Sequence, residues 1–432
     1  MKLYHAYKKQ FNFFLLVIIL VLMPIVFSYA QTATELNSKI DQKSKDIAAL
    51  EQEIKQYQSQ LDDLGKQKSS LNGSLKELDI TRKKLIADIS VTQNKIDQTN
   101  YKIEDLNSQI GNKEDIISSD IVAIKDQIVK TNELELDSIV VNVLSEKNIS
   151  DAWNDIDNMA TVREKIRQKI VELKQIKGEL EDTRKETTDA RNQLVSLKNE
   201  LADQKKIVDQ NTNDKKKLLA QTKNNEANYQ KLLKDRLAKK DAFEKDLRDY
   251  ESQLKFILDP SKLPSSGVLS WPLDNIFITQ MFGKTEAGKR LYANGTHNGM
   301  DFRASVGTPV KAMADGVVAG IGDTDVQCPG VSFGRFTLIK YDNGLASTYG
   351  HLSLIKVATG DRVSRGQIVG YSGNTGYSTG PHLHVSVYAR DAVNLKTLPS
   401  KSCPGHVLTQ PISAVNAYLD PAYYLPPYNY KN

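Results

Sequence analysis

The feature that most constrains this 432-residue chain is a seven-residue repeat of apolar side chains from Leu36 to Ile110. The repeat has twenty-two positions spaced alternately four and three apart, and seventeen of them are apolar. An apolar stripe with a period of 3.5 residues is buried only against another helix, in a supercoiled pair. No proline occurs between Pro24 and Pro260. The sequence therefore predicts an unbroken helical rod of roughly 110 Å over 36–110, at 1.5 Å per residue.

A second helical stretch, from about Asp155 to Leu258, has a looser apolar pattern. Between the two arms lies a more apolar interruption, 135–153. Two arms of similar length around an interruption favour an intramolecular antiparallel hairpin. The alternative is a parallel homodimer through the first arm. Both interpretations place a long α-helical coiled coil over 31–258.

The N-terminus has the pattern of an export signal. Three lysines precede an uncharged, apolar run over 11–30, and the small residues Ser28 and Ala30 stand three and one before Gln31. This arrangement predicts a signal peptide over 1–30. The alternative is an uncleaved membrane anchor, because about 20 apolar residues can span a bilayer. In either case the remainder of the chain is expected to be exported.

The C-terminal part has a different composition. Of the 24 glycines, 20 lie from Gly267 onward, where short β-like runs alternate with turns. The segment 259–267 is therefore predicted to be a linker, and 268–432 a mainly antiparallel β domain. The fold class is α + β in separate domains.

The formal net charge of +5 offers no clue to a polyanionic partner. It divides into +3 in the first 30 residues, −2 in 31–267 and +4 in 268–432. No part has the strongly basic stripe that nucleic-acid binding requires, so no nucleic-acid partner is expected. Cys328 and Cys403 are the two cysteines, and in an exported protein they are predicted to form a disulfide.

Four histidines in the C-terminal part suggest a metal site. His297 and Asp301 form a His-x-x-x-Asp pattern, and His382 and His384 form His-x-His at the start of a β-like run. Residues i and i+2 of a strand project from the same face, so the two imidazoles converge. Two imidazoles and one carboxylate suit Zn²⁺ and leave a fourth position for water. A further histidine nearby, such as His351, could transfer protons.

Longer motifs give the domain a family resemblance. The stretches HNGMDFRASVGTPVKAMADGVV, STYGHLS and GDRVSRGQIVGYSGNTGYSTGPHLHVSVY resemble the lysostaphin/LytM zinc metallopeptidases, in order and spacing. The resemblance covers about Leu269 to Leu425. It implies a β-sheet domain with a groove and cleavage of peptide cross-links in bacterial peptidoglycan.

The resemblance also assigns roles to individual residues. His297, Asp301 and His384 match the zinc ligands of that family. His351 and His382 match its two other site histidines, which polarise the attacking water and stabilise the tetrahedral oxyanion. Tyr292 is a weaker match to an oxyanion contact. The sequence departs from the family pattern at 323–336, which is longer than usual and puts the substrate preference in doubt.

An export signal, a long coiled coil and this domain together resemble the coiled-coil wall hydrolases of cell division (EnvC type). Some members of that group have lost zinc ligands and only activate amidases, whereas every zinc and site position is present here. The resemblance implies a periplasmic or cell-wall-associated zinc endopeptidase. The coiled coil would restrain it and dock on a membrane protein complex. The alternative function is a non-catalytic scaffold that activates another wall hydrolase.

Overall fold

The computed structural model places the chain in two compact units, Met1–Ala49 with Ser90–Leu201, and Leu50–Ile89 with Ala202–Asn432. It describes the chain from residue 2, except for 65–69, 137–148, 260, 262, 285–295, 401 and 429–432. Within the helices, side chains are described except for those of 2–32, 133–136, 149–156, 158 and 159.

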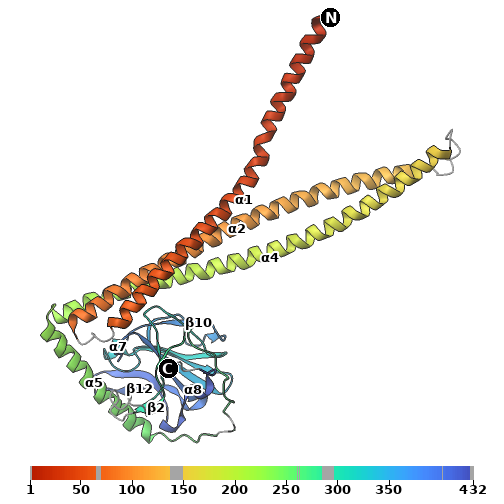
Figure 1. The fold of residues 1–432 in the computed structure, drawn as a ribbon. Coiled ribbons are helices and arrows are strands. Elements are labelled where there is room, and N and C mark those ends of the chain that lie inside the picture. Colours follow the sequence, from red (N-terminus) through yellow and green to blue (C-terminus); the bar gives the residue numbers. More distant parts are fainter. Residues whose placement is uncertain are drawn as a thin grey trace. The chain divides into compact units, whose positions relative to one another are not determined.

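Three long helices supply the first unit: α1 (Lys2–Leu64), α2 (Leu71–Leu136) and α4 (Ile149–Thr222). Arg191 on α4 donates to Asn107 on α2 at 3.4 Å, whereas Arg184 pairs with Glu114 at 2.6 Å. The residue numbers of the paired side chains decrease along α4 as they increase along α2, so the two helices are antiparallel neighbours (Figure 1). This is the arrangement that the hairpin interpretation predicts.

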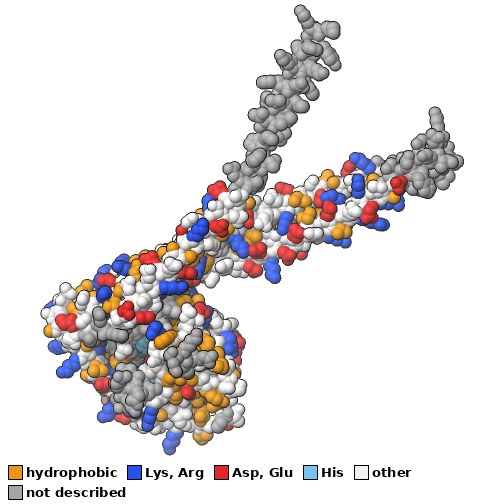
Figure 2. Space-filling view, viewed as in Figure 1, with side chains coloured by type: hydrophobic (Ala, Val, Ile, Leu, Met, Phe, Trp, Pro, Cys, Tyr) orange, Lys and Arg blue, Asp and Glu red, His pale blue; other side chains and the backbone are white. Residues whose placement is uncertain are grey.

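Helix α1 is a second antiparallel neighbour of α2 within the first unit. Lys43 on α1 pairs with Asp97 on α2 at 2.9 Å, and the Lys39 ammonium lies 5.6 Å from the centre of the Tyr101 ring. Basic and acidic side chains are intermixed along the described helical surface in Figure 2. Helix α2 therefore lies beside both α1 and α4.

The prediction of an unbroken helix over 36–110 is wrong. Helix α1 ends at Leu64 and α2 begins at Leu71. The Ser70 hydroxyl accepts a hydrogen bond from the Gly73 N–H at 3.1 Å, which caps the start of α2. The apolar repeat continues across this break in the sequence. The spacing of apolar residues therefore did not reveal that the chain reverses direction between α1 and α2.

The second arm, predicted over 155–258, is also two helices, since α4 is followed by α5 (Glu226–Gln253). Lys223 and Asn224 have φ of 50° and 54°, in the left-handed region that ends a helix. Asn225 then caps α5 by accepting the N–H of Asn228 at 3.2 Å. The α5 helix belongs to the second unit.

An antiparallel sheet, ten-stranded among the described residues, forms the centre of the second unit. Its main path runs β1 (Ile278–Gln280), β4 (Met300–Arg303), β11 (His382–Ala389), β8 (Leu345–Ile355), β7 (Arg335–Tyr341), β6 (Gly316–Asp323) and β9 (Arg362–Val363). Strand β10 (Ile368–Ser372) joins β8 to β5 (Pro309–Lys311), and β14 (Tyr418–Leu419) pairs with β11.

Short elements complete the second unit. Two-stranded sheets are formed by β2 (Gly283–Lys284) with β3 (Thr296–His297), and by β12 (Asn394–Pro399) with β13 (Val407–Ile412). The short helices are α7 (Thr324–Gln327), η2 (Arg390–Ala392), η3 (Val415–Ala417) and α8 (Pro421–Tyr424). The long helices followed by an antiparallel sheet confirm the predicted fold class. The predicted boundary at residue 268 stays a prediction.

Strand alternation separates the core from the polar face of the sheet. Met300 and Phe302 of β4 are fully buried in the main apolar cluster, together with Leu383 and Val385 of β11. Because alternate residues project from opposite faces, Asp301 projects to the other side of the sheet. The core packing therefore sets the direction of the polar side chains.

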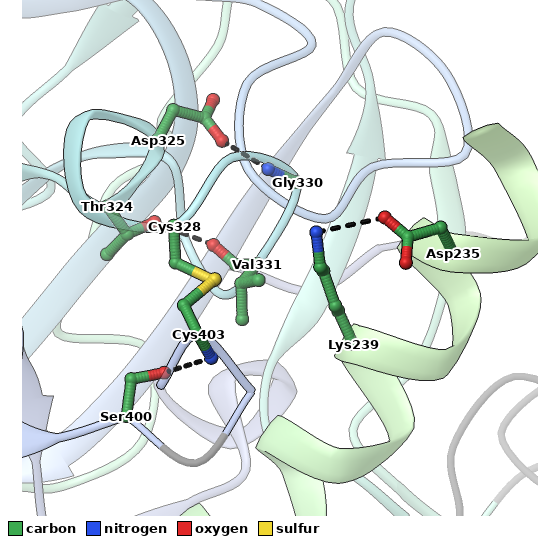
Figure 3. The surroundings of a disulfide bond; sticks show 9 residues. All are labelled: Asp235, Lys239, Thr324, Asp325, Cys328, Gly330, Val331, Ser400 and Cys403. Atoms are coloured by element: carbon green, nitrogen blue, oxygen red, sulfur yellow. Dashed lines mark hydrogen bonds and ion pairs between the residues drawn. A yellow bond between two sulfur atoms is a disulfide. The ribbon is translucent and has the colours of Figure 1, made fainter. Parts of the chain in front are cut away.

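The predicted disulfide is present: Cys328 and Cys403 are bonded, with Cα atoms 5.9 Å apart (Figure 3). It links the segment after α7 to the loop between β12 and β13, 75 residues later. Cys328 is fully buried and packs with Val331, Leu408 and Phe243 of α5. The disulfide-linked loops thus form part of the surface against which α5 lies.

The parts of α2 and α4 within the second unit also pack on the sheet domain. Leu85 and Ile207 form an apolar cluster with Tyr371 of β10. The buried Asp203 carboxylate pairs with Lys356. These contacts anchor the helices that lead into α5.

The apolar run over 11–30 lies outside the residues whose side chains are described, so its role as signal peptide or anchor stays a prediction. Among the helices that are described at side-chain level, none has a stretch long and apolar enough to cross a membrane.

Candidate metal centre

Three strands bring His297, Asp301 and His384 together. Asp301 of β4 lies directly opposite His384 of β11 in the antiparallel register. His297 is the last residue of β3, four positions before Asp301. All three residues are buried. The His-x-x-x-Asp and His-x-His patterns therefore meet at one place.

The donor atoms have the spacing of a metal site. The Asp301 Oδ1 atom lies 2.8 Å from His384 Nδ1 and 3.3 Å from His297 Nε2, and the two imidazole nitrogens are 3.1 Å apart. Tetrahedral zinc with bonds of about 2.0–2.1 Å separates its ligand atoms by about 3.3 Å. Two nitrogens and one carboxylate oxygen fit Zn²⁺ in chemistry as well as in spacing.

The second nitrogen of each ligand histidine has its own partner. His297 Nδ1 donates to the Met281 carbonyl oxygen at 3.0 Å, which leaves Nε2 for a metal. His384 Nε2 donates to the Ser386 hydroxyl oxygen at 2.9 Å, which leaves Nδ1. Such partners orient ligand histidines and hold the tautomer that metal binding needs.

Protonation in the site also suits metal binding. Burial would raise the pKa of Asp301, but the neighbouring His382 and the close contacts of its carboxylate with the His297 and His384 rings hold that pKa well below its usual value. Burial lowers the pKa of His384. The site thus favours an ionised carboxylate and a neutral imidazole, the forms that bind a cation.

The other two predicted histidines lie beside this cluster. His351 of β8 and His382 of β11 have ring centres 4.6 Å apart, and His382 Nε2 lies 3.7 Å from Asp301 Oδ1. His351 Nδ1 donates to the Thr375 carbonyl oxygen at 2.8 Å. Burial and the neighbouring histidines hold the pKa of His351 well below its usual value, so this imidazole is neutral.

His351 has a backbone conformation that is costly for a residue with a side chain. Its φ is 60°, in the left-handed region, and its backbone N–H donates to the Phe333 carbonyl oxygen at 2.7 Å. Such strain persists where the surrounding structure enforces it, commonly at functional sites.

The five residues predicted for the site, His297, Asp301, His351, His382 and His384, lie together in the structure. Tyr292 lies outside the described residues.

A cavity of about 280 Å³ opens over the histidines, and α5 forms one of its walls. The domain contributes His297, His351 and His384 to its lining. Helix α5 contributes six residues: Lys240, Phe243, Glu244, Leu247, Arg248 and Glu251. Sequence reasoning missed this wall. The available signal was the Lys223-Asn224-Asn225 break, which makes α5 a separate helix.

Residues 295–395, which contain the whole cluster, match the family model of peptidase family M23. The C-terminal part of this chain is an M23 peptidase domain. The helices precede that domain and lie outside the match.

Known proteins are similar to part of the chain. Glycyl-glycine endopeptidase ALE-1 of Staphylococcus capitis is 48% identical over 90 residues, which cover 21% of this chain and 24% of that protein. Peptidoglycan DD-endopeptidase ShyA of Vibrio cholerae is 44% identical over 94 residues, which cover 22% of this chain and 20% of that protein. The chain thus spans less than a quarter of the length of these relatives.

Among solved structures, the catalytic domain of lysostaphin from Staphylococcus simulans is 35% identical over a match that covers 27% of this chain and 83% of that chain. Its TM-score of 0.24 is too low to bear on the fold.

We expect Gly299→Ala to weaken zinc binding at least tenfold. A Cβ at this position would lie 2.5 Å from the Val385 carbonyl oxygen and 2.7 Å from the His384 ring, so the ligand ring must move. Gly178→Ala is the matched control, because nothing lies within 4 Å of its Cβ. Zinc affinity measured by competition with a chelating dye compares the two. Equal affinity in the two variants would contradict the role assigned to Gly299.

Proposed function

We propose that this protein is a zinc endopeptidase that hydrolyses peptide cross-links or stem peptides of bacterial peptidoglycan. The observation that carries the proposal is the joint placement of His297, Asp301 and His384 with His351 and His382 beside them. The matched relatives are named as a glycyl-glycine endopeptidase and a peptidoglycan DD-endopeptidase. A non-catalytic scaffold would have no need for all five residues in one site.

The proposed mechanism is water attack on a peptide carbonyl. Zinc held by His297, Asp301 and His384 would supply a Lewis acid that makes a nearby water a nucleophile at neutral pH. His351 has its Nδ1 committed to Thr375, so its neutral Nε2 can accept the proton of the attacking water and pass it to the leaving amine. His382 stabilises the negative charge that develops on the carbonyl oxygen.

We also propose that α5 restrains this activity. Phe243 of α5 is 8% exposed and packs on Cys328 and Leu408. A peptide substrate cannot reach the histidines through the space that α5 occupies. The helices before α5 are anchored on the same domain by Asp203 and Ile207, and so can hold α5 in place or draw it away.

The proposed setting is the periplasm or the cell wall, where the substrate lies. The apolar N-terminal run supports export as a signal peptide or an anchor. We propose that the coiled coil docks on a membrane protein complex during wall remodelling or division, and that this docking moves α5.

Two single substitutions test the enzymatic proposal. In a full-length Phe243→Ala background, His384→Ala should lose bound zinc and the release of soluble muropeptides from purified sacculi. His351→Ala should keep zinc and slow release by roughly 10²–10⁴-fold, because it removes a proton-transfer group. Zinc is measured by elemental mass spectrometry and release by chromatography. A His384→Ala variant that digests sacculi as fast as its parent would refute the proposal.

Phe243→Ala in the otherwise unchanged full chain should raise sacculus digestion at least tenfold. Truncating a buried phenylalanine costs about 3–5 kcal/mol of stability. Here the substitution destabilises the docked state of α5, because Phe243 is buried only while α5 is docked. Leu237→Ala is the control, since Leu237 lies on the same helix and is 50% exposed. If both variants digest at the parent rate, α5 is not a restraint.

Restraint by α5 should weaken as pH rises. Glu251 of α5 is 2% exposed, and burial raises its pKa to about 7 despite hydrogen bonds from the Tyr418 hydroxyl and the Ser413 N–H and the charge of Arg248. Docking is thus most stable below the ordinary pKa near 4.5 and loses about 3 kcal/mol as pH rises through about 7.

Glu251→Gln should remain docked at high pH, because the amide is neutral and its oxygen still accepts the Tyr418 hydroxyl. The activity of the parent divided by that of Glu251→Gln should therefore increase from pH 5.5 to 8. This ratio cancels the pH dependence of catalysis itself. A ratio that is constant with pH would show that Glu251 does not couple docking to pH.

A further inference from the structure

The most unusual occupant of the cavity is the ammonium group of Lys240. The lysine is 3% exposed, and its Nζ atom lies 4.6 Å from the centre of the Tyr377 ring. Lysine is almost never this buried unless its charge is paired. Glu244, one turn along α5, lies 3.3 Å from the ammonium. The preceding residue provides a contrast, because Lys239 pairs with Asp235 at 2.9 Å with 37% of its side chain exposed (Figure 3).

Tyr377 is held in a fixed position relative to the site histidines. It lies in the loop between β10 and β11, two residues after Thr375, whose carbonyl oxygen accepts the hydrogen bond of His351. The backbone N–H of Tyr377 donates to the Ser332 carbonyl oxygen at 2.9 Å. The Gly376 N–H donates to the Asp325 carboxylate at 2.7 Å, which places a negative charge against the same loop.

The groups that favour a cation around the Lys240 ammonium lie partly on α5 and partly on the sheet domain. Glu244 and Asp241, which pair with Lys240, lie on α5 and leave with it. The Tyr377 ring stays with the domain, and the negative face of an aromatic ring attracts an ammonium group. A peptide that replaces α5 in the cavity therefore meets a ring face that already suits a cation.

We propose that the face of Tyr377 is a subsite for a primary ammonium group of the peptide substrate, and that Lys240 occupies this subsite while α5 is docked. The ammonium group comes either from the side chain of a dibasic amino acid or from a free amino terminus. This inference rests on the proposed endopeptidase function. It adds a determinant of specificity: the enzyme prefers peptides that carry a free amine beside the bond that is cut.

The test uses the full chain carrying Phe243→Ala and synthetic cross-linked peptides that differ only in acetylation. One peptide has both amines free, one keeps only the side-chain amine, one keeps only the terminal amine, and one has neither. The peptide with the recognised amine should be cleaved with a kcat/KM about tenfold above the fully acetylated peptide, mainly through KM, as one desolvated cation–π contact allows. The two singly acetylated peptides show which amine is recognised.

Substitutions of Tyr377 assign the preference to its ring. Tyr377→Phe should keep the preference, because the ring face remains, and Tyr377→Leu should reduce the ratio to about one. Bound zinc and the melting temperature check that each variant is folded. A Tyr377→Leu variant that fails this check is replaced by Tyr377→Met for the same comparison.

The outcomes separate this inference from the function on which it rests. Equal cleavage of the free and acetylated peptides, or a preference that survives in the aliphatic variant, overturns the subsite and leaves the endopeptidase intact. A zinc-loaded, folded Phe243→Ala protein that cleaves none of the peptides and releases nothing from sacculi overturns the endopeptidase and the subsite together.

Discussion

The pairing of β4 with β11 is the constraint on which the rest of the site depends. It sets Asp301 directly opposite His384, and it buries Met300, Phe302, Leu383 and Val385 on the other face of the sheet. A slip of one residue in this register would turn the ligands into the core and the core residues toward the cavity. The apolar packing that stabilises the domain therefore also orients its metal ligands.

In the proposed function, the same domain surface would serve two purposes with opposite effects on activity. The histidines and Tyr377 line one cavity, and the disulfide-linked loops beside it provide an apolar contact for Phe243. Helix α5, docked on these loops, lines the same cavity as the histidines. The proposed restraint by α5 would need no separate inhibitory site, since the catalytic residues and the docking contacts lie on adjoining parts of one surface.

The metal site could be predicted from sequence because its residues follow local rules. The two-residue period of a strand places His382 and His384 together, and the family motifs identify His351. The arrangement of the helices could not be read in the same way. The heptad repeat continues through the break before Leu71, and it is satisfied by any neighbouring helix, whichever way the chain runs. The α5 wall depends on long-range packing of Phe243, which no local pattern records.

The composition of α5 fits the proposal that this helix can leave the cavity. Each charge that a docked helix buries adds a desolvation cost, which opposes docking. Helix α5 buries Lys240 and Glu251 in the cavity wall, together with Phe243 and the partly buried Leu247. The apolar contacts favour docking and the buried charges oppose it. In the proposed restraint, this opposition would keep the docked and released states within the few kcal/mol that one differential contact with a partner, or one titrating carboxylate, can shift.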